Sequence, residues 1–183
     1  MAATPTPQEV GCIVDDFRLP GIDGEQHTLN SYMEGRKGAV VLFWSGVCAH
    51  CVRYDGFLNE FAARYPDLAL IGIASRTAET PDHIRKTIAE RKLDFPILLD
   101  AGSVIAKRWY TQQTPRVFLI DAKRTLLYRG AIDNFKYPGD PEHAAYLEAA
   151  IAEFLGGKPV SRKETASFGC AIYTVYYDIP LKL

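Results

Sequence analysis

The stretch that decides the fold is WSGVCAHCVRYDG, Trp44 to Gly56, which carries two cysteines three positions apart. It continues the apolar run GAVVLFW at 38–44, and such a run is typical of a strand covered on both faces. After Cys51 the apolar residues recur with helical spacing, from Phe57 to Tyr65. The sequence therefore predicts a buried strand, a short loop that bears Cys48, and then a helix.

The position of the two cysteines indicates redox chemistry. A thiol attacks well only as a thiolate, and a helix N-terminus favours the anion. Cys48 lies where the strand gives way to the helix, and Cys51 is one turn further, within bonding reach of the first sulfur. Cys48 can then attack a disulfide, and Cys51 can resolve the mixed disulfide. His50 lies between them, and a protonated imidazole would further favour the Cys48 thiolate.

Three other uses of the cysteine pair are less favoured. Zinc needs about four ligands at one point, but the remaining cysteines are isolated and no His-x₃₋₅-His pair exists. Covalent haem attachment needs His directly after the second Cys, and Val52 stands there. A structural disulfide across two residues would restrict little chain entropy. Redox exchange remains, and it requires no metal and no diffusible cofactor.

Length and charge narrow the class of protein. The chain has 183 residues, enough for one domain with a core, and a net charge of −1. That charge argues against nucleic acid or an anionic membrane as the main partner, and no apolar segment approaches the ~20 residues of a membrane span. Residues 1–10 lack the basic region and apolar core of a signal peptide and are expected to form a flexible leader. The compartment stays open: bacterial periplasm if a signal was removed, otherwise cytoplasm.

Strand and helix patterns alternate along the rest of the chain. An Asp-Gly step at 23–24 favours a hairpin. The later elements are expected as a strand at 68–75, a helix from Thr80, an extended segment at 95–100, a short helix at 103–109, strands at 114–121 and 125–133, and a helix that begins at Asp140 and closes at Gly156–Gly157. This order predicts an α/β fold whose central sheet is covered by helices on both faces.

Residues 158–183 form a tail of different composition. A polar segment precedes FGCAIYTVYYDIPLKL at 168–183, which is too apolar to extend into water. It is expected to pack on its own domain or on a second copy, which would give a homodimer. Cys170 in this tail has three interpretations: a third redox thiol near Cys48, a disulfide partner of Cys12, or a buried bystander, the default for a free cysteine.

Three segments carry a resemblance to a known family. Trp44–Cys51 resembles the active-site segment of the thioredoxin superfamily. Thr114–Pro115, followed by a strand, resembles that family's cis-proline loop. VDDFRLPGIDGEQHTL at 14–29 resembles the N-terminal hairpin of the redoxin branch, the alkyl hydroperoxide reductase and thiol-specific antioxidant group.

The resemblance implies a thioredoxin-like fold. Its expected parts are a central mixed β-sheet flanked by helices on both faces, an N-terminal β-hairpin and a C-terminal extension. It covers residues 11–157, which are expected to form the redoxin domain, with the leader at 1–10 and the tail at 158–183 outside it.

The resemblance also implies a thiol–disulfide oxidoreductase that exchanges disulfides with protein partners and with an upstream redox protein. In the family, the loop at Thr114 and a cis Pro115 faces the Cys pair, and its backbone pairs with an extended substrate. Trp44 is expected beside the site, where it shields the thiols and borders the substrate. His50 matches the strongly oxidising members of the superfamily.

Two alternative functions remain open at this point. One is a peroxiredoxin-like thiol peroxidase, an antioxidant enzyme. Its Pro-x-x-x-Thr-x-x-Cys pattern is poorly matched, because Ser45 takes the Thr position and Val41 the Pro position. The other is a binding module that retains the fold without catalysis.

Overall fold

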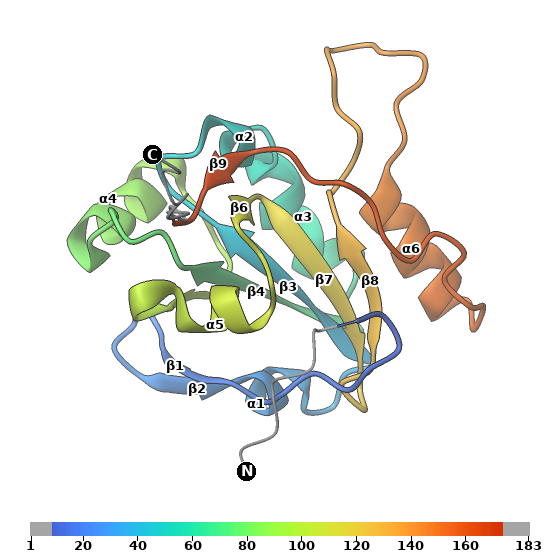
Figure 1. Ribbon diagram of the computed structural model, residues 1–183, viewed down its shortest axis with the longest axis horizontal. Helices are drawn as coiled ribbons and strands as arrows, with labels where there is room; N and C mark the ends of the chain where they lie inside the picture. The colour runs from blue at the N-terminus through green and yellow to red at the C-terminus, as the bar shows by residue number, and fades with distance from the viewer. Residues whose placement is uncertain (1–8, 174–183) are drawn as a thin grey trace, which may run out of the picture.

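The computed structural model describes residues 9–173, and a five-stranded mixed sheet organises them (Figure 1). Its strand order is β5-β4-β3-β7-β8, in which β3, β4 and β5 are parallel and β7 runs antiparallel to both β3 and β8. The strands are β3 (Gly38–Trp44), β4 (Leu68–Ala74), β5 (Ile97–Leu99), β7 (Arg116–Asp121) and β8 (Leu126–Gly130). The mixed sheet confirms the predicted fold class.

The central strand β3 divides the core into two halves. All seven of its residues are buried, and successive side chains of a strand point to opposite faces. Val40, Leu42 and Trp44 belong to one buried cluster, and the intervening residues belong to the other. The continuously apolar run is therefore explained by a sheet covered on both faces, as predicted.

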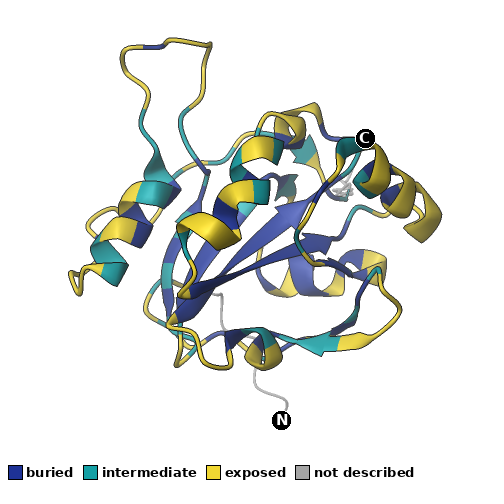
Figure 2. Ribbon diagram, turned by 180° about the vertical axis from the view of Figure 1, so that it is seen from behind, coloured by how far each residue is buried: buried dark blue, intermediate teal, exposed yellow. Residues whose placement is uncertain are grey.

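Helices cover both faces of the sheet (Figure 1). One cluster contains side chains of α3 (Asp55–Arg64), α4 (Pro81–Arg91) and α6 (Tyr146–Leu155). The other contains side chains of α1 (Leu29–Met33) and α5 (Val104–Arg108), which follows the 3₁₀ turn η1 (Ala101–Ser103). The strands are buried throughout most of their length, and the helices expose their outer faces (Figure 2).

Local signals placed two elements correctly. β1 (Arg18–Pro20) and β2 (Gln26–Thr28) pair antiparallel around the Asp-Gly turn, which confirms the predicted hairpin. Gly24 there has φ +87°, a conformation that favours glycine. Thr80 caps α4, because its hydroxyl accepts a hydrogen bond from the backbone N–H of His83 at 3.2 Å.

The expected start of the last helix was wrong. Helix α6 begins at Tyr146, not at Asp140. The carboxylate of Asp140 is buried and accepts the backbone N–H of Glu142 at 2.9 Å, which closes a turn instead of starting a helix. Residues 131–145 consequently form a loop that projects beyond the sheet between β8 and α6 (Figure 1).

The C-terminal segment returns to the domain. Its strand β9 (Cys170–Ala171) pairs antiparallel with β6 (Gln113–Thr114), directly before β7. Most of the expected leader (residues 1–8) and the last part of the tail (174–183), on which the expected homodimer depends, lie outside the described residues. Among residues 9–173, no helix combines the length and the apolar character needed to cross a membrane.

Candidate active site

Cys48 and Cys51 lie at the junction between β3 and a short helix, α2 (Ala49–Val52). Cys48 is the N-cap residue, and its carbonyl accepts the backbone N–H of Cys51 at 2.9 Å, the first turn of the helix. The helical stretch that the sequence indicated after Cys51 is interrupted at 53–54 before α3 begins. Both sulfur-bearing side chains are buried: Cys48 is 0% and Cys51 1% exposed.

The loop before Cys48 is held on two sides. The backbone N–H of Gly46 donates to a carboxylate oxygen of Glu79 at 2.8 Å, and the Gly46 carbonyl accepts from Arg91 at 3.1 Å. Arg91 also donates through Nε to Asp55 at 2.8 Å. A Cβ atom on residue 46 would lie 2.9 Å from the Glu79 carboxylate, so the glycine allows this close approach. The position of Cys48 is thereby tied to α3 and α4.

The Thr114–Pro115 loop meets the cysteine pair as predicted. The peptide bond between Thr114 and Pro115 is cis, which confirms that prediction. Antiparallel pairing of β3 with β7 places Phe43 opposite Arg116, so the loop before β7 faces the residues that follow β3. The Cys48 thiol donates to the carbonyl oxygen of Thr114 at 3.2 Å.

The two thiols are driven to opposite protonation states. A hydrogen bond from the Cys51 thiol lowers the pKa of Cys48 to about 4, helped by hydrogen bonds from Cys170 and Thr114 and opposed by burial. The same Cys48–Cys51 hydrogen bond, together with burial, raises the pKa of Cys51 far above its usual range. At neutral pH this arrangement favours the thiolate of Cys48 and keeps the proton on Cys51, as a pair of attacking and resolving thiols would require.

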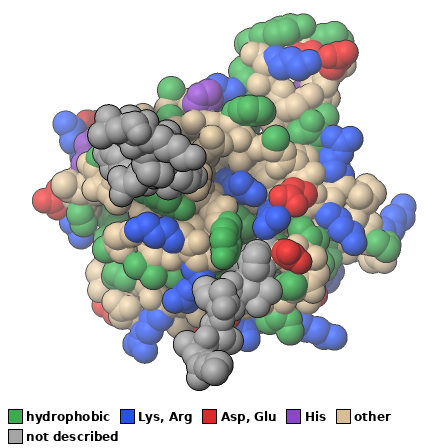
Figure 3. Space-filling view, viewed as in Figure 1, with side chains coloured by type: hydrophobic (Ala, Val, Ile, Leu, Met, Phe, Trp, Pro, Cys, Tyr) green, Lys and Arg blue, Asp and Glu red, His purple; other side chains and the backbone are tan. Residues whose placement is uncertain are grey.

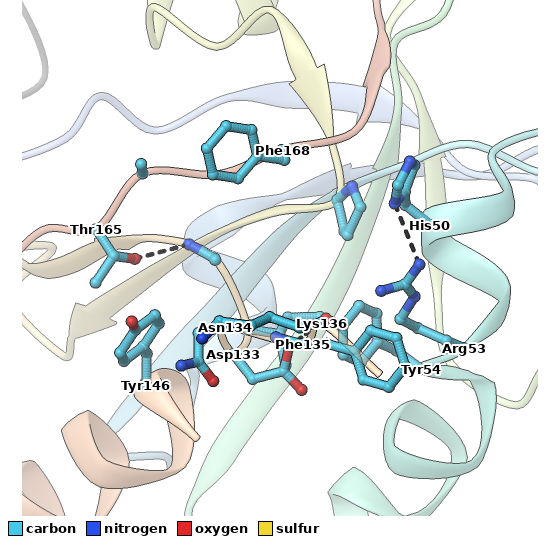
Figure 4. Close-up of a pocket in the computed structure, with 14 residues that line it drawn as sticks. His50, Arg53, Tyr54, Asp133, Asn134, Phe135, Lys136, Tyr146, Thr165 and Phe168 are labelled. Atoms are coloured by element: carbon cyan, nitrogen blue, oxygen red, sulfur yellow. Dashed lines mark hydrogen bonds between the residues drawn. The ribbon is translucent and has the colours of Figure 1, made fainter. Parts of the chain in front are cut away.

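His50 and Trp44, the two other predicted site residues of this segment, lie in opposite surroundings, one exposed and one buried. His50 is exposed, and its Nδ1 lies 3.3 Å from Nη2 of Arg53 (Figure 4). The hydrogen bonds that lower the pKa of Cys48 come from other groups, so a tuning role of His50 stays a prediction. Trp44 is 0% exposed and shares the buried cluster of the cysteines. It supports the thiols from inside the core, and its predicted border with substrate is untested.

Sequence reasoning left three interpretations of Cys170 open, and the structure agrees with the one that places it near Cys48. Strand β9 brings it opposite Thr114 and into the packed cluster that contains Cys48. Cys12 lies elsewhere, because its carbonyl accepts the N–H of Leu126 at 2.9 Å, at the start of β8 and the far end of the sheet. A disulfide needs Cα atoms within ~7 Å, so the Cys12–Cys170 pairing is wrong. The sequence offered one signal for this position of Cys170, the Gly169–Cys170 step in a segment rich in aromatic and β-branched residues.

A pocket of about 460 Å³ adjoins the cysteine site (Figure 4). Its lining includes His50 and Pro115, residues 131–136, and Thr165, Ala166 and Phe168. Phe168 is 81% exposed at its rim. Among residues 9–173, no group of three or more His, Cys, Asp or Glu side chains is arranged to hold a metal ion.

Comparison with known proteins adds named relatives. The chain is 28% identical over 116 residues to the thiol-disulfide oxidoreductase ResA of Geobacillus thermodenitrificans; the match covers 63% of this chain and 66% of the relative. The chain thus spans slightly less than two thirds of that relative's length. A secreted Mycobacterium tuberculosis disulfide oxidoreductase aligns with TM-score 0.53 and 26% identity, over 60% of this chain and 79% of that protein.

A second solved structure matches almost the whole chain. It is a hypothetical protein of Sinorhizobium meliloti, with TM-score 0.80 and 31% identity, covering 90% of this chain and 93% of that one. The profile of the AhpC/TSA family matches residues 10–129, well over half of the chain. The paired cysteines, the cis-proline loop and this match agree, and the chain belongs to the AhpC/TSA family.

Proposed function

We propose that this protein is a thiol–disulfide oxidoreductase that exchanges disulfides with protein partners through Cys48 and Cys51. The observation that carries the proposal is the opposite shift of the two pKa values, downward for Cys48 and upward for Cys51, beside the carbonyl of Thr114. Such a pair supplies one ionised nucleophile and one protonated resolving thiol. The names of the ResA relatives support the same reaction class.

The reaction has two balanced steps. The Cys48 thiolate attacks one sulfur of a partner's disulfide, which forms a mixed disulfide and releases the partner's other sulfur as a thiolate. Cys51 then loses its proton to that thiolate or to water and attacks the Cys48 sulfur. The Cys48–Cys51 disulfide forms, and the partner leaves as a dithiol. The reverse sequence donates a disulfide, and an upstream redox protein restores the starting form.

The surroundings of Cys48 favour a polypeptide as the substrate. Thr114 and Pro115 present a backbone edge beside the nucleophile, and an extended chain can pair with such an edge. On the face in Figure 3, Lys and Arg side chains are scattered among acidic and apolar ones instead of forming one basic patch. In this proposal His50 borders the path of the partner to the thiols, and Trp44 supports the thiols from inside the core.

Turnover of a protein disulfide by catalytic amounts of the protein, with a dithiol as final reductant, tests the proposal. We expect wild type and Cys12→Ser to turn over the substrate at equal rates, because Cys12 lies at the far end of the sheet. Cys48→Ser should be inactive. Equal rates for Cys48→Ser and wild type would contradict the proposal. Rapid peroxide consumption without disulfide exchange would point to the peroxidase alternative, and inertness in both assays to the binding module.

A further inference from the structure

The backbone edge beside the nucleophile already holds a strand of the same chain. In β9, Cys170 lies directly opposite Thr114, and Ala171 lies opposite Gln113 (Figure 1). The backbone N–H of Ile172 donates to the carbonyl of Gln112 at 2.8 Å, which extends the pairing by one residue. The tail therefore makes the contacts that an extended substrate would make.

Thr114 connects the two cysteines. Its carbonyl oxygen accepts the Cys48 thiol at 3.2 Å, and its hydroxyl donates to the carbonyl of Cys170 at 3.5 Å. Cys170 packs against the buried cluster that contains Cys48. Its thiol and its backbone N–H both favour the Cys48 thiolate and help to lower the pKa of Cys48. The third thiol therefore lies beside the first.

A glycine makes this approach possible. A Cβ atom on residue 169 would lie 1.8 Å from the carbonyl oxygen of Thr114 and 2.7 Å from its carbonyl carbon. No side chain fits in that space without moving the backbone. Gly169 therefore allows β9 to lie close enough to β6 for Cys170 to reach Cys48.

The position of β9 limits the access of a partner to Cys48. Cys48 is 0% exposed, although a thiol that attacks a partner's disulfide must be reached from outside. Cys170 packs against the cluster that contains Cys48, and β9 fills the pairing edge. An incoming polypeptide must displace β9 before it can use that edge.

We propose that Cys170 is a third redox thiol of this site, which exchanges with Cys48, and that β9 is an internal substrate strand that covers the nucleophile until a partner displaces it. The proposal rests on the proposed function. In the oxidised protein, the Cys170 sulfur, after losing its proton, attacks Cys48 of the Cys48–Cys51 disulfide. A Cys48–Cys170 disulfide forms, and Cys51 leaves as a thiolate that takes up the proton. The step is an isomerisation, so it needs no added oxidant.

A variant without Cys51 allows the Cys48–Cys170 disulfide to form without competition from the Cys48–Cys51 disulfide. Reduced Cys51→Ala protein is treated with oxidised glutathione, free thiols are alkylated, and the digest is read by mass. Glutathione disulfide first forms a mixed disulfide with Cys48 and releases one glutathione; attack by Cys170 then releases the second. We expect a linked Cys48–Cys170 peptide as the main product, and a stable glutathione adduct on Cys48 in the Cys51→Ala/Cys170→Ala control.

Two outcomes would overturn the inference, and they are distinguishable. If Cys51→Ala accumulates the glutathione adduct on Cys48 while Cys170 stays free for alkylation, Cys170 is not a redox thiol, although the proposed function survives. If Cys48 forms neither the adduct nor the linked peptide in either variant, both the inference and the proposed function fail. Cys12→Ser/Cys51→Ala should behave like Cys51→Ala, because Cys12 lies far from the site.

Discussion

The sulfur of Cys48 lies 3.2 Å from the backbone carbonyl oxygen of Thr114, to which the thiol donates a hydrogen bond when it is protonated. This contact joins the N-cap residue of α2 to strand β6, two segments separated by 66 positions in the sequence. It places the proposed nucleophile at the same backbone edge that β9 occupies. Chemistry and substrate pairing therefore meet at one residue, Thr114.

The low pKa of Cys48 predicts how the stability of the reduced protein depends on pH. Its pKa is about 4 in the folded protein, below the ~8.5 of an unfolded thiol. The ionised form therefore stabilises the folded state; this contribution is full above ~pH 8.5, falls with decreasing pH and is lost below the folded pKa. The free energy of unfolding in urea, wild type minus Cys48→Ser, should rise from about pH 4 to about pH 8.

Cys51 does not disturb this comparison, because its raised pKa keeps it protonated in the folded protein across that range. In the unfolded chain it is also mainly protonated there. A stability difference that stays flat with pH would show that Cys48 is not an unusually acidic thiol. The oxidised wild type, which has no free Cys48 thiol, serves as the control and should lack the dependence.

Replacing the resolving thiol should trap the intermediate. In Cys51→Ser the mixed disulfide between Cys48 and a partner has lost its principal route of resolution. A polypeptide partner, unlike glutathione, displaces β9 and Cys170 with it, so we expect covalent complexes with a protein disulfide substrate that are visible on non-reducing gels and that a strong dithiol releases. Since Cys170 also packs against the cluster that contains Cys48, the complexes should last longer in Cys51→Ser/Cys170→Ser. Absence of complexes in both variants would argue against the two-cysteine mechanism.

Gly169→Ala tests the cover over the nucleophile. The new methyl group would overlap the Thr114 carbonyl, so β9 must move away. Because a few hydrogen bonds of ~1 kcal/mol each hold the strand, we expect alkylation of Cys48 to accelerate by about tenfold or more. Gly56→Ala is the matched control, since a Cβ atom there meets nothing within 4 Å. Equal rates in the two variants would show that β9 does not limit access.

Arg91 should matter for both stability and rate. It binds Asp55, donates to the Gly46 carbonyl at 3.1 Å and lies over the Trp44 ring at 5.5 Å. Lysine cannot reproduce this forked geometry, so we expect Arg91→Lys to lower the free energy of unfolding by ~2 kcal/mol and to slow disulfide exchange.

The same helix provides a control for Arg91. Arg85 pairs with Asp82 at 2.8 Å, but both side chains are largely exposed, and Arg85→Lys should cost less than ~1 kcal/mol. Urea denaturation and exchange rates of the two variants check this. If the two substitutions cost the same, the contacts of Arg91 with the loop before Cys48 contribute little.

The sequence predicted those parts of the site whose structure depends on local sequence patterns. An apolar run, a Cys pair and a following helical period are short-range features, and the strand–loop–helix unit formed where they indicated. The prediction of a cis bond before Pro115 depended on the family resemblance, because most X–Pro bonds are trans and the residues alone would not indicate cis. The start of α6 was predicted wrongly because the Asp140 carboxylate closes a turn. In the sequence, an acidic residue followed by Pro is compatible both with such a turn and with a helix N-cap.

The place of Cys170 could not be derived in the same way. Its contact with Cys48 depends on a pairing between β6 and β9, which lie more than fifty residues apart in the sequence. Two-residue strands carry almost no periodic signal. The close approach at Gly169 becomes visible when the opposing carbonyl of Thr114 is known.

Redox equilibration of the full chain tests the central claim most directly. The protein is equilibrated in glutathione buffers of graded potential, alkylated, and each cysteine peptide is read by mass. We expect Cys48 to become protected from alkylation in one two-electron step together with Cys51 or Cys170, while Cys12 titrates independently. A Cys48 that stays alkylatable, or that pairs with neither thiol across the whole range, would contradict its role as the redox nucleophile.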